Sequence, residues 1–273
     1  MLSGDLKLAD DASPGAWIAP LLQGDFGAVS LTVPSGYPAY ARICHPATDS
    51  SDRPVNWPEV ASFTGRTAHS LMQWHALVGS PDWLNFKGSL WPGGNPERGN
   101  LAPGPLEALC ELLEEHATDA AHCFFGLWVG WAWVESGSDR MTLRRTGVGD
   151  AWTTSTERIP PAFTGQELSR PRLRLPDRDY LLLTGPLSAA TQVGDPNGVN
   201  GFDPQSPNLF WPADHAWCVA SEIDFDSTLV GGSTGLIQTI LDTPALDAWP
   251  VKPEDSLACD ADRVNDVPDW SGP

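Results

Sequence analysis

Runs of apolar residues along the chain predict several buried β-strands. The clearest is CFFGLWVGWAWV, residues 123–134, in which the odd and the even positions are both apolar. Because successive side chains of a strand point to opposite faces, this run predicts a central strand that is covered on both sides. Residues 180–184 predict a second apolar strand, and residues 26–33 and 39–44 predict a hairpin around a turn rich in proline and glycine.

Apolar residues at helical spacing predict helices over 67–78 and 105–119, and a third that begins at Ser233. Ser233 is a residue type that caps helix N-termini well, because its side chain accepts a hydrogen bond from a free backbone N–H. Segments rich in proline and glycine, 86–105 and 191–208, predict long loops. These elements predict one α+β domain over 1–273, with a mixed or largely antiparallel sheet, packed helices and long loops rich in proline and glycine. A weaker subdivision is expected near 136–176.

Three carboxylates occur at every second position in SEIDFDSTLVGGS, residues 221–233. If residues 217–226 form a strand, Glu222, Asp224 and Asp226 share one face and lie about 7 Å apart along it. Like charges at this spacing repel one another unless something positive lies close to them. The question that the sequence raises is therefore what neutralises these three groups.

Four answers are open. An all-oxygen ligand set suits Mg²⁺ or Ca²⁺, so the three carboxylates are candidate metal ligands. They are equally candidates for a catalytic acid and base, because mutual repulsion raises one pKa. Water alone can also solvate them. The fourth answer is a strand of alternating arginines, Arg170, Arg172 and Arg174, which can pair with them across a sheet or contact a ligand.

Other candidate site residues lie just before the carboxylates, in LFWPADHAWCVA. His215 is the titratable group that we expect to meet Glu222 if this region is an active site. Trp211 and Trp217 are candidates for the walls of a ligand pocket, although large aromatic rings more often contribute core burial. His75, on the apolar face of the predicted 67–78 helix, is interpreted as a core histidine.

Composition limits the class of partner. The chain has 273 residues, a formal net charge of −19 and thirteen tryptophans. So strong an acidic surplus argues against nucleic acid and anionic membrane and is compatible with a basic protein. The surplus is uneven: residues 140–178 carry eight arginines and four acids, whereas 195–273 carry fourteen acids and two bases.

The cysteines and the start of the chain bear on the compartment. Five cysteines lie far apart without a C-x-x-C pair, which predicts buried thiols in a reducing cytoplasm rather than a disulfide framework or a zinc site. The first residues lack the basic start and apolar core of a secretory signal. The longest apolar run has twelve residues, too short to span a membrane. The oligomeric state is not indicated.

Two parts of the sequence, 89–133 and 178–187 with 206–249, resemble a pattern that recurs in uncharacterised bacterial proteins. The resemblance implies that both parts belong to one fold unit and carries no catalytic residue across. The sequence therefore predicts a cytoplasmic acidic binding protein that engages a basic partner, as toxin-neutralising immunity proteins do. The alternative is a hydrolase that uses Glu222, Asp224 and Asp226, with or without a divalent metal.

Overall fold

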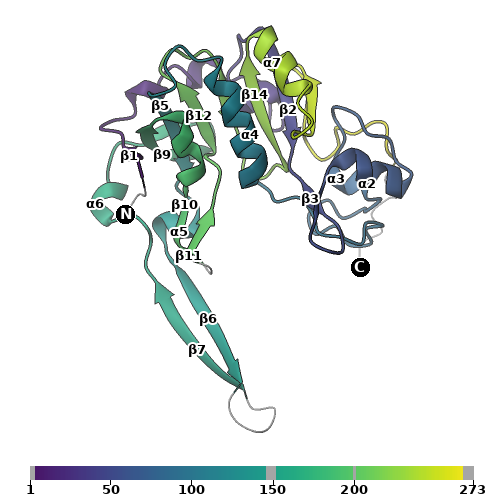
Figure 1. Cartoon of the computed structure of the whole chain (residues 1–273), viewed down its shortest axis with the longest axis horizontal. Coiled ribbons are helices and arrows are strands. Elements are labelled where there is room, and N and C mark those ends of the chain that lie inside the picture. The colour runs from purple at the N-terminus through teal and green to yellow at the C-terminus, as the bar shows by residue number, and fades with distance from the viewer. Residues whose placement is uncertain (1–3, 146–151, 199–200, 267–273) are drawn as a thin grey trace.

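An antiparallel sheet forms the centre of the molecule (Figure 1). The computed structural model describes residues 4–145, 152–198 and 201–266. Across the sheet the strands run in the order β1 (Lys7–Leu8), β9 (Arg178–Gly185), β5 (Cys123–Trp128), β12 (Leu209–Pro212), β13 (Cys218–Ala220), β14 (Ser227–Gly232), β2 (Ala39–Cys44) and β15 (Ala248–Val251), and β8 (Leu173–Leu175) also pairs with β9. The predicted α+β class with an antiparallel sheet is confirmed, while the single domain stays a prediction.

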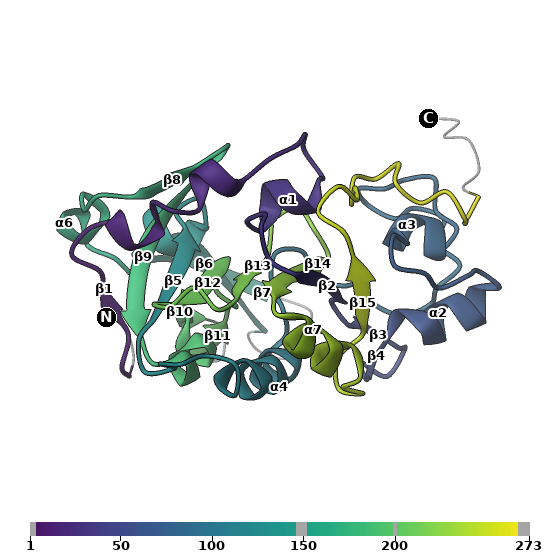
Figure 2. The same ribbon diagram turned by 90° about the horizontal axis from the view of Figure 1, so that it is seen from above.

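Both faces of this sheet are covered, as Figure 2 shows. Helices α4 (Pro103–Glu114) and α7 (Thr234–Leu241) lie on one face, and the N-terminal segment lies on the other; this segment holds α1 (Val29–Thr32) and two 3₁₀ turns (Ser13–Gly15 and Ala19–Leu21). Along β9, Leu181 and Leu183 enter the core under the helices, whereas Tyr180 and Leu182 enter the core under the N-terminal segment. Two-sided coverage explains why β5, β12 and β13 are apolar on both faces.

A small helical lobe with its own core packs beside the end of the sheet that carries β2 and β15 (Figures 1 and 2). It contains α2 (Trp57–Thr64), α3 (Trp74–Leu77) and the strand pair β3 (Ala47–Thr48) and β4 (Pro54–Val55). The buried rings of Trp57 and Trp74 pack with their centroids 5.3 Å apart. Asn56 starts α2 with a capping box, since its side chain accepts from the backbone N–H of Glu59.

A long hairpin projects from the body (Figure 1). Its strands are β6 (Ser138–Arg145) and β7 (Trp152–Ile159), and within the described part of the chain they pair only with each other. Helices α5 (Ala132–Glu135) and α6 (Gly165–Leu168) flank it in sequence. We call β6 and β7 the arm.

Several local predictions were wrong. Residues 26–33 contain the helix α1 instead of a strand, and the predicted helix over 67–78 is limited to α3. The predicted loop over 191–208 contains the strand pair β10 (Gly194–Gly198) and β11 (Gly201–Pro204). In each case the element formed is only four or five residues long, and tertiary contacts outweigh local preference over so few residues.

Other local predictions are confirmed. The side chain of Ser233 caps α7 by accepting from the backbone N–H of Leu236 at 3.2 Å. Four of the five cysteines are buried free thiols, and Cys259 is exposed. Among the described residues, no helix has the length and apolar character needed to cross a bilayer.

Candidate functional site

The acidic segment is a turn, so the prediction of one strand over 217–226 is confirmed only for Cys218–Ala220 and is wrong for the carboxylates. Strand β13 ends at Ala220 and β14 begins at Ser227. Between them the backbone N–H of Phe225 donates to the carbonyl of Glu222 at 3.0 Å and closes a tight turn. The backbone N–H of Gly99, from the loop before α4, donates to the carbonyl of Phe225 at 2.8 Å. We call residues 222–226 the acidic turn.

Gly99 is essential to the support of this turn. Its φ of 68° lies in the left-handed region, and a Cβ at this position would lie 2.7 Å from Cα of Ile223. A side chain would therefore strain the backbone of residue 99 and push the loop off the turn.

Arg178, at the start of β9, neutralises the first two carboxylates. Its Nε and Nη2 donate to Oε1 of Glu222 at 3.1 and 2.6 Å, and Nη2 also donates to Oδ2 of Asp224 at 2.8 Å. The guanidinium lies 5.9 Å from the ring centroid of Trp128. Burial raises the pKa of Glu222, and Arg178 opposes that shift.

The arginines expected to pair with the acidic turn have other partners. Arg170 donates to the carbonyl of Ala9 at 2.9 Å, and Arg172 pairs with Glu135 at 3.2 Å. Arg174 is exposed and lies opposite Asp179 in the β8–β9 pair. Cross-strand pairing, one of the four open answers, is therefore wrong for these arginines. They enter the sheet only in β8, which spans three residues and is hydrogen-bonded to β9 rather than to β13 or β14.

Arg42 neutralises the third carboxylate from inside the molecule. Its side chain is 1% exposed and lies 3.5 Å from Oδ1 of Asp226, which is 14% exposed. Its other donors are used by the fold: Nε donates to Oγ of Ser227 at 3.0 Å, and Nη1 donates to the carbonyls of Met72 and Ser70 at 2.7 and 3.2 Å. Burial raises the pKa of Asp226, and Arg42 and Arg98 act in the opposite direction.

The acidic turn forms part of a cavity of about 320 Å³ between the end of the sheet and the helical lobe. Asp224 and Asp226 line it, and Glu222 does not. Its other lining residues are mostly apolar or aromatic, with a few polar groups: Phe26, Arg42, Gln73, Trp74, His75, Trp83, Leu84, Phe86, Arg98, Phe225, Ser227, Leu257, Ala258 and Cys259. A mainly apolar cavity with a few convergent polar groups is typical of a binding site.

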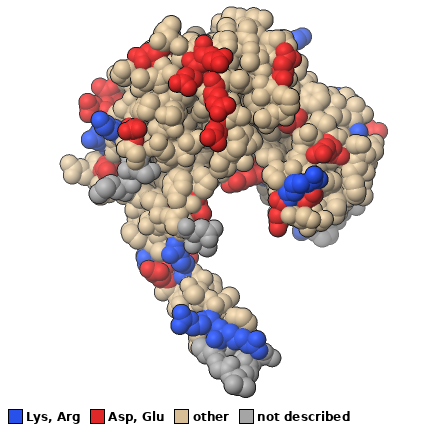
Figure 3. All heavy atoms as spheres, in the orientation of Figure 1, with Lys and Arg blue, Asp and Glu red and all other residues tan. Residues whose placement is uncertain are grey.

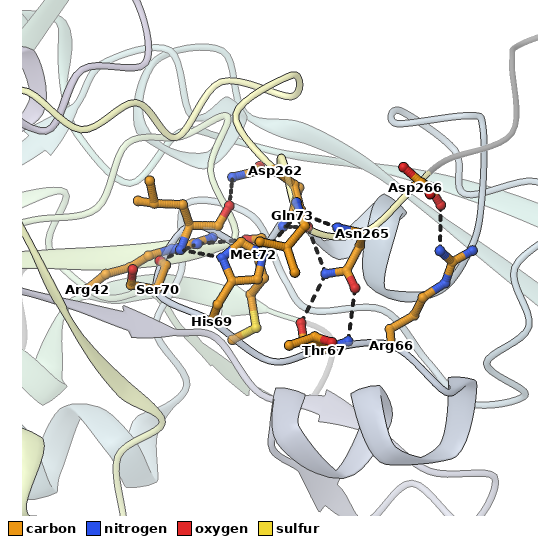
Figure 4. Close-up of polar contacts among 12 residues, drawn as sticks. Arg42, Arg66, Thr67, His69, Ser70, Met72, Gln73, Asp262, Asn265 and Asp266 are labelled. Carbon is orange, nitrogen blue, oxygen red and sulfur yellow. Dashed lines mark hydrogen bonds and ion pairs between the residues drawn. The ribbon is translucent and has the colours of Figure 1, made fainter.

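The C-terminal segment is held against the lobe by polar contacts close to this cavity, as Figure 4 shows. The Asp262 carboxylate accepts from Nε2 of His69 at 2.9 Å and from the backbone N–H of Gln73 at 3.2 Å. The side-chain amide of Asn265 exchanges two hydrogen bonds with the backbone of Thr67, at 2.9 and 3.0 Å. These contacts fix the residues before them, Leu257 to Cys259, as one wall of the cavity.

A buried histidine connects the acidic turn to its surroundings. The backbone N–H of His45 donates to the carbonyl of Asp226 at 2.9 Å. The two ring nitrogens lie 2.6 Å from the carbonyl of Glu97 and 2.8 Å from Oγ1 of Thr228, which in turn is 2.7 Å from Oγ of Ser221. Burial lowers the pKa of His45 to about 4, so this imidazole is neutral at neutral pH.

The remaining predicted site residues lie away from the cavity. His215 is in the turn between β12 and β13, at the opposite end of β13 from the acidic turn, and its ring stacks on Trp17 with a centroid distance of 4.2 Å. Trp211 and Trp217 are buried in the cores on opposite faces of the sheet. The structure therefore does not bring these three residues together with the carboxylates.

The described residues do not provide a set of ligands for the metal ion that the sequence suggested. Within the described ranges, no group of three or more His, Cys, Asp or Glu side chains is arranged to hold a metal ion. Glu222 and Asp224 share Arg178 instead, and Asp226 faces the cavity. Binding of Mg²⁺ or Ca²⁺ stays a prediction.

Sequence reasoning missed several cavity residues. Arg42 is a lone charge inside the apolar strand AYARIC, and this pattern alone indicates a buried ion pair. Phe26, Trp83 and Arg98 carried no comparable signal, because they belong to loops that meet only in the folded chain. His75, interpreted as a core residue, lines the cavity, and burial lowers its pKa.

Comparisons of this chain with protein-family models, curated proteins and solved structures give no match. The resemblance of 89–133, 178–187 and 206–249 to bacterial proteins therefore stays a prediction, and the geometry of the cavity is the basis for any functional argument.

Proposed function

We propose that this protein binds a partner protein through a basic side chain, lysine or arginine, that enters the cavity beside the acidic turn. The observation that carries the proposal is the position of Asp226, a partly exposed carboxylate in a mainly apolar cavity. Its counter-ion Arg42 lies 3.5 Å away and donates to three other acceptors. The carboxylate therefore keeps capacity to accept a short, charge-assisted hydrogen bond from a ligand cation.

The walls of the cavity suit the alkyl and cationic parts of such a side chain. Phe26 and Trp83 line it and are 59% and 52% exposed. Aromatic faces attract ammonium and guanidinium groups, and apolar surface packs against the methylene stem that carries them. Exposed apolar side chains gathered around a polar centre also mark interaction sites in general.

The charge of the whole chain supports a basic partner. A net charge of −19 raises the rate at which a basic protein encounters this surface, and it repels acidic competitors. Composition thus favours a basic partner, and the cavity beside the acidic turn is the place where we propose that it binds.

Arg98 is the charge that opposes this proposal, because it also lines the cavity. Its Nη2 donates to the carbonyl of Trp83 at 2.7 Å, and its guanidinium lies 5.2 Å from the ring centroid of Phe86. We therefore assign Arg98 to bracing the wall that presents Trp83.

The proposal can be tested by titrating the full chain with small amides of single amino acids, followed by calorimetry or NMR. Nα-acetyl-arginine amide and Nα-acetyl-lysine amide are expected to bind, and Nα-acetyl-citrulline amide, a neutral isostere of the arginine compound, is expected to bind at least about tenfold more weakly. Asp226→Asn should weaken binding of both cations by a similar factor. Asp10→Asn, at a fully exposed carboxylate outside the cavity, is the matched control and should bind as the unmodified protein does.

Two results would overturn the proposal. One is that neither cation binds at millimolar concentration. The other is that Arg98→Met abolishes binding while Asp226→Asn leaves it unchanged, which would indicate an anionic ligand.

A hydrolase is the second candidate, favoured by one observation: Asp226 and His75 line the same cavity, and burial raises the pKa of the carboxyl and lowers that of the imidazole. Shifts in these directions bring a catalytic acid and base toward a common working pH. Hydrolysis of ester or phosphoester substrates that is lost in Asp226→Asn and retained in Asp10→Asn would favour this candidate. A rise in melting temperature with Mg²⁺ or Ca²⁺, absent from Asp224→Asn, would favour its metal-dependent form.

A further inference from the structure

The arm presents an apolar face that nothing in the described chain covers. The β6–β7 register places Met141 opposite Thr156, Leu143 opposite Thr154 and Arg145 opposite Trp152, and all these residues lie on one face. The side chains of Met141, Leu143 and Trp152 are 65%, 62% and 60% exposed. A two-stranded hairpin is marginally stable in water on its own, so an arm that projects with this face uncovered is expected to pack against something.

The charge of the arm indicates which surface it packs against. The described part of the arm carries four arginines and two acids, in a chain whose net charge is −19; the arginines are Arg140, Arg144, Arg145 and Arg158. Figure 3 shows blue side chains toward the outer end of the arm and a red stripe on the body. A basic arm on an acidic body complements the surface of a second copy of the same chain.

Helix α4 offers the matching surface. Glu107, Glu111 and Glu114 follow one another at helical spacing and are exposed. The half-buried Ala108 and Leu112 lie beside them and add apolar surface. This combination of acidic and apolar groups matches the arginines and the apolar face of the arm.

We propose that the arm of one copy docks on α4 of a second copy and that the second arm docks on α4 of the first. Such a two-fold pair makes the same contact twice, which is how most homodimers close. It would cover Met141, Leu143 and Trp152 and place Arg145, which shares their face, beside the glutamates of α4; Arg144 lies on the other face of β6 and adds to the positive charge of the arm. The proposal uses none of the cavity residues, so it is independent of the binding function proposed above.

Sedimentation velocity of the full chain at tens of micromolar tests this proposal. We expect a dimer at low salt, about 50 mM, and weaker association at about 500 mM, because the charged part of the contact is screened. Met141→Thr with Leu143→Thr, and separately Arg144→Glu with Arg145→Glu, should each weaken dimerisation at least about tenfold. Phe63→Thr and Arg53→Glu, at side chains that are 61% and 71% exposed outside the arm, are the matched controls and should leave dimerisation unchanged.

A charge exchange separates loss of the contact from loss of folding. The triple variant Glu107→Lys, Glu111→Lys, Glu114→Lys should be monomeric alone, as should Arg144→Glu with Arg145→Glu. Mixed together, these two variants should form a heterodimer, because each of its two contacts then joins opposite charges. A monomeric unmodified protein at low salt, a dimer that is insensitive to the arm variants, or a mixture that stays monomeric would overturn the proposal. Binding of an oligonucleotide by a monomeric chain through Arg144 would overturn it as well.

Discussion

Two arginines neutralise the acidic turn from opposite sides, and they are held in very different ways. Arg42 comes from β2, is buried, and donates to a hydroxyl and two backbone carbonyls besides its ion pair with Asp226. Arg178 comes from β9, is partly exposed, and gives most of its hydrogen bonds to Glu222 and Asp224.

This difference shows why three carboxylates that look equivalent in sequence have different roles. Arg178 occupies Glu222 and Asp224 with short contacts; the pair with Glu222 is partly buried, and the pair with Asp224 is exposed and contributes less to stability. Arg42 lies at a longer distance from Asp226 and is fixed by the backbone, so it offsets the charge of the carboxylate without occupying it. Spacing along the chain thus says less about function than the position of the counter-charge.

The largest effect is expected from removing the buried arginine. Arg42→Met leaves Asp226 without its counter-ion and leaves the carbonyls of Ser70 and Met72 without a donor. We expect the free energy of unfolding, measured with urea, to fall by about 3–5 kcal/mol. Adding Asp226→Asn should recover part of the loss, because it removes the unpaired charge.

Arg53→Met is the control for this comparison, because Arg53 makes an ion pair with Asp49 at the surface. It should cost about 0.5 kcal/mol or less. A loss below about 1 kcal/mol for Arg42→Met would contradict a structural role for the buried pair.

The next effect concerns pH on the buried side of the acidic turn. Burial lowers the pKa of His45 from 6.5 to about 4, so between these values the unfolded chain binds a proton that the folded chain does not. Stability contributed by neutral His45 is complete above pH 6.5 and falls as the pH decreases toward 4, by about 3 kcal/mol in total. In His45→Gln, the unfolding free energy should depend less steeply on pH in this window. His122→Gln, at an exposed histidine, should keep the steepness of the unmodified protein.

The smallest effect is expected on the exposed side. Arg178→Met removes the partner of Glu222 and Asp224 and should lower the unfolding free energy by about 1–2 kcal/mol, since Glu222 is only partly accessible to water. The pKa of Glu222, followed by carboxyl carbon NMR, should rise further because the main group that opposes burial is then missing. Arg172→Met, which breaks the pair with Glu135, is the control and should leave that pKa unchanged. An equal loss of stability in Arg178→Met and Arg42→Met would remove the distinction between the two sides.

Much of the fold was predictable because its strongest patterns are long and local. The first half of the apolar run 123–134, which forms β5, the amphipathic helix α4 and the Ser233 cap of α7 each depend on neighbours in sequence. The prediction of a strand was wrong for the end of that run, where Ala132–Glu135 forms α5. Short segments were less predictable. Alternation over five residues, as in EIDFD, fits a strand and a turn equally well, and a hydrogen bond from Phe225 to Glu222 decided for the turn.

The candidate site was predictable only in part. The sequence by itself determined an acidic chain of the α+β class with a cluster of carboxylates, because composition and short-range periodicity are properties of the chain alone. Only the tertiary structure decided that Arg178 and Arg42, rather than Arg170, Arg172 and Arg174, neutralise those carboxylates. The physical reason is that a charge is neutralised by whichever opposite charge the fold brings within a few ångströms of it. Sheet order and loop packing determine which group that is.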